Sequence, residues 1–127
     1  MCTQNELDTI LGEVTKSYRS TYGNRISKIV LYGSYARGDY RDDSDIDIAA
    51  IVKGPRRELQ DELKKVWEVS HDLGLEYGIM VSPTVIPLDE FEEWKDDLPY
   101  YRNIEQEGII VSTIPSISSF KERIMGV

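Results

Sequence analysis

The chain is organised around residues 33–48, which read Gly33-Ser34-Tyr35-Ala36-Arg37-Gly38-Asp39-Tyr40-Arg41-Asp42-Asp43-Ser44-Asp45-Ile46-Asp47-Ile48. Apolar runs lie on both sides, at 29–32 and 46–52, and each predicts a buried β-strand. Between the strands lie a glycine-serine turn, an arginine and several aspartates. Such a segment can hold a polyphosphate and the metal ions that accompany it. We therefore expect the rest of the chain to be the scaffold that holds this segment in place.

Length and composition predict one soluble domain spanning residues 1–127, with residues 112–127 as a flexible tail. The chain has 127 residues, of which 40% are hydrophobic and 30% charged. No apolar run approaches the ~18 residues of a membrane span, and the N-terminus resembles no secretion signal. The single cysteine, Cys2, cannot form an internal disulfide. A reducing cytoplasm is therefore the predicted location.

The net charge of −8 disfavours general nucleic-acid binding, which calls for a basic face. Three interpretations remain open for this acidic balance: metal ions, a basic protein partner, or simple solubility.

Periodicity predicts an α/β or α+β domain in which helices flank a small mixed sheet. The predicted helix at 56–73 is expected to end at Gly74, and Trp67 is expected to face inward. Pro83 predicts that the third strand lies at a sheet edge. The expected helices are 3–22, a short turn at 34–37, 56–73, 88–96 and 100–106, and the expected strands are 26–32, 45–52, 75–86 and 109–111.

Gly33, Ser34 and Arg37 are the candidate phosphate ligands. Glycine has no Cβ, so its backbone can approach a phosphate closely. A helical turn that starts at Ser34 would direct free N–H groups toward an anion. The planar guanidinium of Arg37 suits a phosphate. Taken alone, a glycine-serine pair after a strand is more often only a turn.

Asp45 and Asp47 are the candidate metal ligands. Residues i and i+2 of a strand share one face, with Cα atoms about 6–7 Å apart. Both carboxylates could reach one hard cation, or share two ions ~3.5–4 Å apart. With no histidine or cysteine nearby, oxygen ligands favour Mg²⁺ or Mn²⁺ over zinc. The alternative is a solvated acidic loop.

These residues resemble a known family. Gly33-Ser34, ten residues and Asp45-Ile46-Asp47 resemble the defining motif of the DNA polymerase β-like nucleotidyltransferase superfamily. The runs 33–38 and 43–47 are similar to its minimal nucleotidyltransferase (MNT) branch. Residues 101–108 are similar to the C-terminal part of MNT antitoxins encoded beside HEPN-domain toxins.

The resemblance implies transfer of AMP from ATP to a hydroxyl, with release of pyrophosphate. Gly33 and Ser34 would hold the β- and γ-phosphates, Arg37 would steady the triphosphate, and Asp45 and Asp47 would ligate Mg²⁺. MNT antitoxins of this kind are thought to adenylylate a tyrosine of a partner HEPN ribonuclease. The expected partners are therefore a HEPN toxin and ATP, while homo- and hetero-oligomers both remain open.

A third carboxylate, which the superfamily supplies from a later strand to deprotonate the attacking hydroxyl, is not evident. Gly78 occupies the expected position. Glu76, two residues earlier on the same predicted strand face, is the substitute candidate for the catalytic base, and its alternative is an exposed charge. Two other functions therefore stay open: an inactive MNT protein that neutralises its toxin by binding, and an enzyme acting on a small-molecule hydroxyl.

Other residues that could suggest a site have simpler interpretations. His71 is expected to be solvated near the end of a helix. Trp67 and Trp94 are interpreted as core residues or partner-facing anchors. Tyr100, Tyr101 and Arg102 are interpreted as a packed helix face, with a toxin-binding surface as the alternative.

Overall fold

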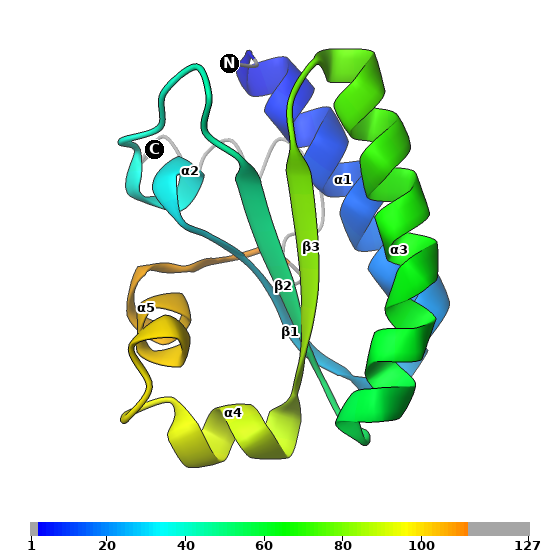
Figure 1. Cartoon of the computed structure of the whole chain (residues 1–127), viewed down its shortest axis with the longest axis vertical. Helices are drawn as coiled ribbons and strands as arrows, with labels where there is room; N and C mark the ends of the chain where they lie inside the picture. Colours follow the sequence, from blue (N-terminus) through cyan, green and yellow to red (C-terminus); the bar gives the residue numbers. More distant parts are fainter. Residues whose placement is uncertain (1–2, 112–127) are drawn as a thin grey trace.

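The computed structural model describes residues 3–111, and Figure 1 shows the order of their elements. Five helices, one 3-10 turn and four strands follow one another in this part of the chain. Their bounds are α1 (Gln4–Tyr22), η1 (Gly23–Arg25), β1 (Ile26–Tyr32), α2 (Ser34–Arg37), β2 (Ile46–Val52), α3 (Arg56–Tyr77), β3 (Val81–Pro87), α4 (Leu88–Trp94), α5 (Pro99–Glu107) and β4 (Ile109–Ile110).

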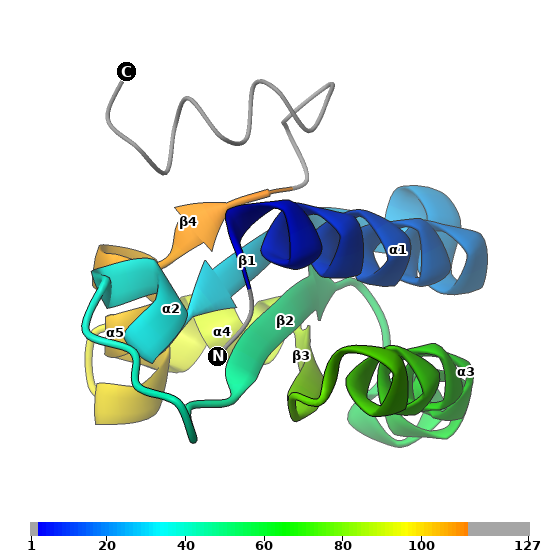
Figure 2. The same ribbon diagram turned by 90° about the horizontal axis from the view of Figure 1, so that it is seen from above.

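The four strands form one mixed sheet in the order β3-β2-β1-β4. Strand β1 runs antiparallel to both β2 and β4, whereas β2 and β3 are parallel. Helices α1 and α3 cover one face and α4 and α5 lie on the other, as the view in Figure 2 shows. The predicted small mixed sheet flanked by helices is confirmed, as is the place of the Pro83 strand at a sheet edge.

Alternation along β2 separates the core into two layers. Ile46, Ile48, Ala50 and Val52 pack in the layer beneath α1 and α3. Ala49 and Ile51 belong to the opposite layer, which is closed by α4 and α5. Because successive side chains of a strand point to opposite faces, Asp47 lies on this second face, at the end where β2 begins.

The helix after β2 is longer than predicted. It ends at Tyr77, and Gly78, with φ +67°, forms its C-cap. Gly74, the predicted stop, lies inside the helix and accepts hydrogen bonds from the N–H groups of Gly78 and Ile79. A Cβ at position 74 would lie 2.6 Å from the carbonyl oxygen of Ile79, so this glycine serves a close backbone approach. The prediction of a strand beginning at residue 75 is therefore wrong.

Trp67 was predicted to face inward, but 45% of its surface is exposed. The buried stripe of α3 includes Val66, and the next residue points about 100° away around a helix. Trp94 is likewise exposed at the end of α4, while Phe91 fills the core, and His71 is exposed as expected. The predictions for Cys2 and for residues 112–127 lie outside the described residues. None of the helices in residues 3–111 is long and apolar enough to cross a membrane.

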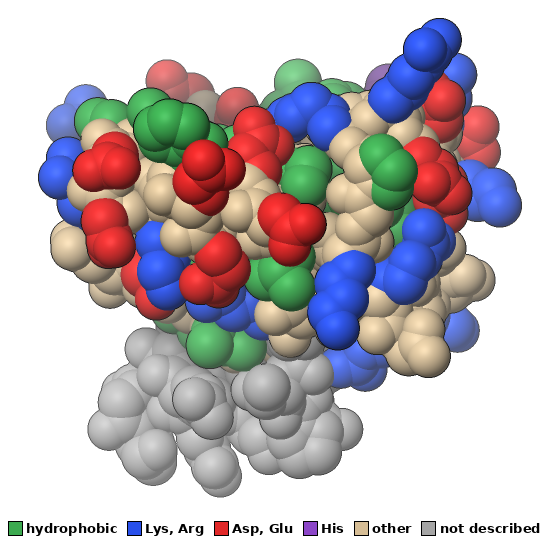
Figure 3. Space-filling view, turned by 90° about the horizontal axis from the view of Figure 1, so that it is seen from below, with side chains coloured by type: hydrophobic (Ala, Val, Ile, Leu, Met, Phe, Trp, Pro, Cys, Tyr) green, Lys and Arg blue, Asp and Glu red, His purple; other side chains and the backbone are tan. Residues whose placement is uncertain are grey.

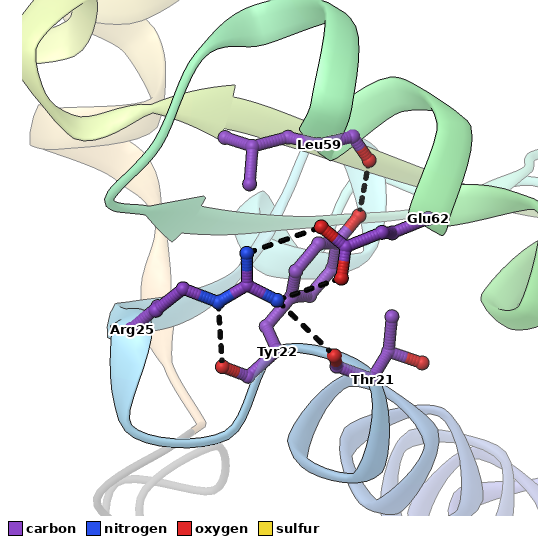
Figure 4. A network of polar contacts seen from close by, with 5 residues as sticks. All are labelled: Thr21, Tyr22, Arg25, Leu59 and Glu62. Atoms are coloured by element: carbon purple, nitrogen blue, oxygen red, sulfur yellow. Dashed lines mark hydrogen bonds and ion pairs between the residues drawn. The ribbon is translucent and has the colours of Figure 1, made fainter.

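A polar network fastens the end of α1 to the beginning of α3, as Figure 4 shows. The guanidinium of Arg25 contacts both carboxylate oxygens of Glu62, at 3.1 and 2.7 Å. The buried hydroxyl of Tyr22 donates to the carbonyl of Leu59 at 2.7 Å. The covering helices are therefore joined to each other as well as to the sheet.

At the end of the molecule away from α2, acidic and basic side chains gather on different sides. Figure 3 shows acidic side chains gathered on the side of α4 and α5, and lysine and arginine side chains mostly on the side of α1 and α3. The ion pair of Arg56 with Glu90 joins the two regions.

The hydroxyl of Tyr18 bridges β2 and β3. It accepts a hydrogen bond from the N–H of Thr84 at 3.0 Å, and its own proton faces the carbonyl oxygens of Thr84 at 2.7 Å and Ile48 at 3.1 Å. The side chain of Tyr18, which comes from α1, therefore lies between the parallel strands β2 and β3 and contacts Ile48, the residue that follows Asp47.

Tyr18→Phe should lower the free energy of unfolding by about 1–3 kcal/mol, because the N–H of Thr84 and the facing carbonyls lose their shared partner. Tyr22→Phe is the matched control, since it removes one hydroxyl bonded to one carbonyl and should cost about 0.5–1.5 kcal/mol. Urea unfolding of both variants measures the difference. An equal loss of stability would contradict the bridging role of Tyr18.

Candidate active site

Gly33 is held against Asp47. Tyr32, the last residue of β1, pairs with Asp47 in the antiparallel register. The next residue, Gly33, turns the chain with φ +75°. A Cβ at Gly33 would lie only 2.5 Å from Oδ2 of Asp47. A side chain at position 33 would have to displace this carboxylate, and the backbone conformation of the turn, φ +75° and ψ −156°, itself favours glycine.

The turn after Gly33 is the predicted short helix, α2. The N–H groups of Ala36 and Arg37 both donate to the carbonyl of Gly33 at 3.1 Å. Ser34 is the first helical residue, and the first N–H groups of a helix have no acceptor within it. Of the predicted phosphate ligands, Gly33 therefore lies against Asp47, and Ser34 follows it as the first residue of the helical turn.

The loop between α2 and β2 is fixed by local contacts. The ring of Tyr40 stacks on that of Tyr35 with centroids 4.4 Å apart and an interplanar angle of 3°. The N–H of Arg41 donates to the hydroxyl oxygen of Ser44 at 2.7 Å. The polar loop therefore packs back against α2, and its last residue, Asp45, directly precedes β2.

Arg37 is held by carboxylates from two segments. Its Nε lies 3.3 Å from Asp39, and its Nη1 lies 3.4 Å from Glu107 at the end of α5. Its positive charge lowers the pKa of Asp47, although burial of Asp47 and the negative charge of Asp45 both raise that pKa. A triphosphate at this turn would compete with Asp39 and Glu107 for the guanidinium.

Asp45 and Asp47 form a pair of unequal exposure. Asp45 is exposed just before β2, whereas Asp47 is partly buried. Burial raises the pKa of Asp47, and the negative charge of Asp45 raises it further. A divalent cation between the two would relieve both effects. This all-oxygen pair fits Mg²⁺, which usually takes one or two protein carboxylates and fills its remaining positions with phosphate oxygens and water.

The third carboxylate is not where the sequence suggested. Glu76 lies in the last turn of α3 and is exposed, so the prediction that it shares a strand face with the other site residues is wrong. Throughout residues 3–111, no group of three or more His, Cys, Asp or Glu side chains is arranged to hold a metal ion.

Ser82 occupies the strand position facing Asp47. The register of β2 and β3 pairs these two residues, so their side chains share one face of the sheet. Sequence reasoning missed Ser82 because the helix was ended too early. The alternation of buried Val81, Pro83 and Val85 with partly exposed Ser82 was the signal that could have found it.

Tyr32 completes this face and joins it to α5. Its hydroxyl lies 2.7 Å from that of Tyr100, and the two rings meet edge to face. Burial and the contact with Tyr100 raise the pKa of Tyr32. The sequence had suggested only a buried strand residue here.

The sequence also matches a family model, described as "Nucleotidyltransferase domain", over residues 11–111. The chain belongs to the nucleotidyltransferase family. The match spans the site and the whole sheet, so it confirms both the fold predicted by the resemblance and an enzyme of this family.

This nucleotidyltransferase is similar to two Methanocaldococcus jannaschii proteins, each named "Putative protein adenylyltransferase". One, MJ0604, is 33% identical over 99 residues, covering 78% of this chain and 91% of that protein. The other, MJ0141, is 31% identical over 80 residues, covering 63% and 79%. A solved toxin-antitoxin structure with AMP-PNP is 17% identical and covers 98% of this chain and 86% of that one. Its TM-score is 0.49, so it carries no argument about function.

Gly33→Ala should disrupt the site, while Gly38→Ala should only strain the backbone. Gly38 is left-handed, with φ +86° and ψ 6°, so Gly38→Ala should lose about 1–2 kcal/mol of stability. Gly33, with φ +75° and ψ −156°, has a backbone conformation that is essentially confined to glycine, so Gly33→Ala should lose about 1–3 kcal/mol. Only the Cβ at position 33 meets a neighbour, since nothing lies within 4 Å of one at position 38. Calorimetric titration with a non-hydrolysable ATP analogue and Mg²⁺ should show at least about tenfold weaker binding for Gly33→Ala alone. Equal affinities would refute the close approach to Asp47.

Asp47→Asn should stabilise the protein at pH 7 in the absence of divalent ions. Because the pKa of Asp47 is raised in the folded state, the folded protein binds that proton more tightly than the unfolded chain does. Stability is therefore lost as pH rises from the ordinary aspartate range through the raised pKa. Thermal unfolding should rank the variant above the wild type at pH 7 and equal to it near pH 3. The opposite ranking at pH 7 would contradict the assignment.

Proposed function

We propose that the protein transfers AMP from ATP to a tyrosine hydroxyl of a HEPN-domain ribonuclease, as the antitoxin of a HEPN/MNT pair. The observation that carries this proposal is the backbone of Gly33 lying on the carboxylate of Asp47, because it joins a phosphate-binding turn to a metal ligand. The names of the two curated relatives support a protein acceptor.

Each site residue has a role in this proposal. Gly33 and the N–H groups at the start of α2 hold the β- and γ-phosphates, with the hydroxyl of Ser34 beside them. Arg37 exchanges its partners, Asp39 and Glu107, for phosphate oxygens. Asp45 and Asp47 would hold Mg²⁺, which supplies charge neutralisation at the transferred phosphate.

The transfer is a displacement at the α-phosphorus of ATP. The acceptor oxygen forms a bond to this phosphorus while the bond to the bridging oxygen of the β-phosphate breaks, and pyrophosphate leaves with the electron pair. The proton of the acceptor hydroxyl passes to solvent, because the strand position facing Asp47 holds Ser82 and not an acidic residue that could accept that proton. The residues of the turn and of β2 align the reacting groups, a contribution that can account for much of the rate.

A second function is favoured by the same serine. With Ser82 facing Asp47, and no third acidic ligand in the described part of the chain, the site has two carboxylates. Loss of a general base typically costs 10²–10⁴-fold in rate. A protein with this site could bind ATP and neutralise its partner by complex formation alone.

The test is transfer of label from α-³²P-ATP to the HEPN-domain protein encoded beside this chain. Label should appear on a partner tyrosine in the presence of Mg²⁺. Asp45→Asn with Asp47→Asn should reduce labelling by at least about 100-fold, since the metal ions supply several kcal/mol and 1.4 kcal/mol is tenfold in rate. Asp96→Asn with Asp97→Asn is the matched control, because these exposed aspartates follow α4, away from the site, and make the same charge change.

Three outcomes separate the hypotheses. Label that depends on Asp45 and Asp47 supports transfer. Toxin inhibition that survives their replacement, with no label on the partner, supports binding alone. A genome that encodes no HEPN protein nearby would contradict the pairing.

A further inference from the structure

The end of α5 is fixed beside α2. Strand β4, which follows α5, runs antiparallel to β1, so its first residue, Ile109, pairs with Leu31 near the end of β1 that leads into α2. The N–H of Val111 donates to the carbonyl of Ile29 at 2.8 Å and continues this attachment. Figure 2 shows α2 beside the end of α5. The last residue of that helix, Glu107, is therefore held next to α2.

Gly108 brings this end of α5 directly onto β1. Its N–H donates to the carbonyl of Ile104 at 3.1 Å and caps the helix. Its φ of −69° is one that any residue adopts, so the backbone conformation does not require glycine. A Cβ at this position would collide with the side chain of Val30 and would lie 2.5 Å from the carbonyl oxygen of Ile104. The missing side chain therefore allows the close packing that fixes the position of Glu107.

The carboxylate of Glu107 holds a residue of the candidate site, Arg37. Nη1 of Arg37 lies 3.4 Å from Glu107, and Nε lies 3.3 Å from Asp39. Asp39 is only two residues from Arg37, in the polar loop, whereas Glu107 is 70 residues away in sequence and ends a packed helix. Because these N–H groups are engaged, a bound triphosphate has to displace the carboxylates to reach them.

The contact between Arg37 and Glu107 is weak enough to be exchanged. The two side chains are 42% and 40% exposed, and an ion pair in contact with water contributes little to stability. A triphosphate carries several negative charges, and its oxygens match the planar guanidinium in pairs. A phosphate group can therefore replace Glu107 at Arg37 without disturbing the packing of α5 on β1.

We propose that Glu107 is a positioning residue that acts through Arg37 and sets how tightly the site holds its phosphate ligand. Without nucleotide, Glu107 keeps the guanidinium at the end of α5. Bound ATP draws the guanidinium away, and when the reaction is over Glu107 competes with pyrophosphate for it. Glu107 therefore lowers the affinity of the site for ATP and for pyrophosphate alike. This inference rests on the proposed function for the role of Arg37 as a triphosphate ligand.

The experiment measures ligand binding directly. Glu107→Gln keeps the shape of the side chain and removes its charge. The variant should bind a non-hydrolysable ATP analogue with Mg²⁺, and pyrophosphate with Mg²⁺, about three- to fivefold more tightly in calorimetric titrations, which is the range that an exposed ion pair can account for. The gain should shrink in high salt. The thermal midpoint of the variant should stay close to that of the wild type.

Glu105→Gln is the matched control. Glu105 belongs to the same helix and its replacement makes the same change of charge, but it pairs with Lys28 and Lys95 rather than with Arg37. This variant should leave the affinities for both ligands unchanged.

Arg37→Gln tests whether Glu107 acts through the guanidinium. In a chain that carries Arg37→Gln, the addition of Glu107→Gln should change the affinities no more than Glu105→Gln does, because the two residues act as one unit. Simple repulsion between Glu107 and the triphosphate would persist without Arg37.

Each contrary result overturns a different statement. Affinities that Glu107→Gln leaves unchanged, or that Glu105→Gln raises equally, overturn the role of Glu107 while the proposed function stands. A gain that persists in the Arg37→Gln chain overturns the route through the guanidinium. A wild type that binds both ligands but labels no partner overturns the transfer reaction alone. A wild type that binds neither ligand overturns the proposed function and the role of Glu107 together.

Discussion

The packing of a glycine backbone against a carboxylate is the constraint on which the site depends. Gly33 can lie on Asp47 only because β1 and β2 are in the register that pairs Tyr32 with Asp47. A slip of one residue would turn Asp47 into the layer beneath α1 and α3 and bring Ile46 or Ile48 to the turn. The buried residues of both strands exclude that slip, so the hydrophobic core itself specifies where the turn at Gly33, the proposed phosphate ligand, meets Asp47, the proposed metal ligand.

Most of the fold could be predicted from local pattern. The bounds of β1 and α2 follow directly from the apolar run and from the glycines at 33 and 38, and β2 begins one residue after the predicted start. The error at Gly74 has a tertiary cause. A glycine that ends a helix and a glycine that admits a neighbouring carbonyl are identical in sequence, and only the position of Ile79 distinguishes them. The same error hid Ser82, because a strand that begins six residues late presents different residues to the site.

The site has tighter connections to its surroundings than its motif implies. Helix α5 contacts it at both ends, through Tyr100 on Tyr32 and through Glu107 on Arg37. The motif gave no indication of either contact, because both depend on a helix that follows it by more than fifty residues. Asp47 therefore lies between Arg37, which is already paired with carboxylates, and β3, which presents the hydroxyl of Ser82. The two carboxylates of Asp45 and Asp47 are the dominant feature of the site.

The length of α3 has a consequence of its own. Its 22 residues span about 33 Å at the usual rise, whereas the seven residues of β2, whose path it retraces, span about 23 Å. A connection between parallel strands needs only to return to the starting edge of the sheet. This helix is longer than that return requires by roughly two turns, and it lies on the face of the sheet opposite to Asp47. The length of α3 is therefore independent of the pairing of β1 with β2, which alone brings Gly33 onto Asp47.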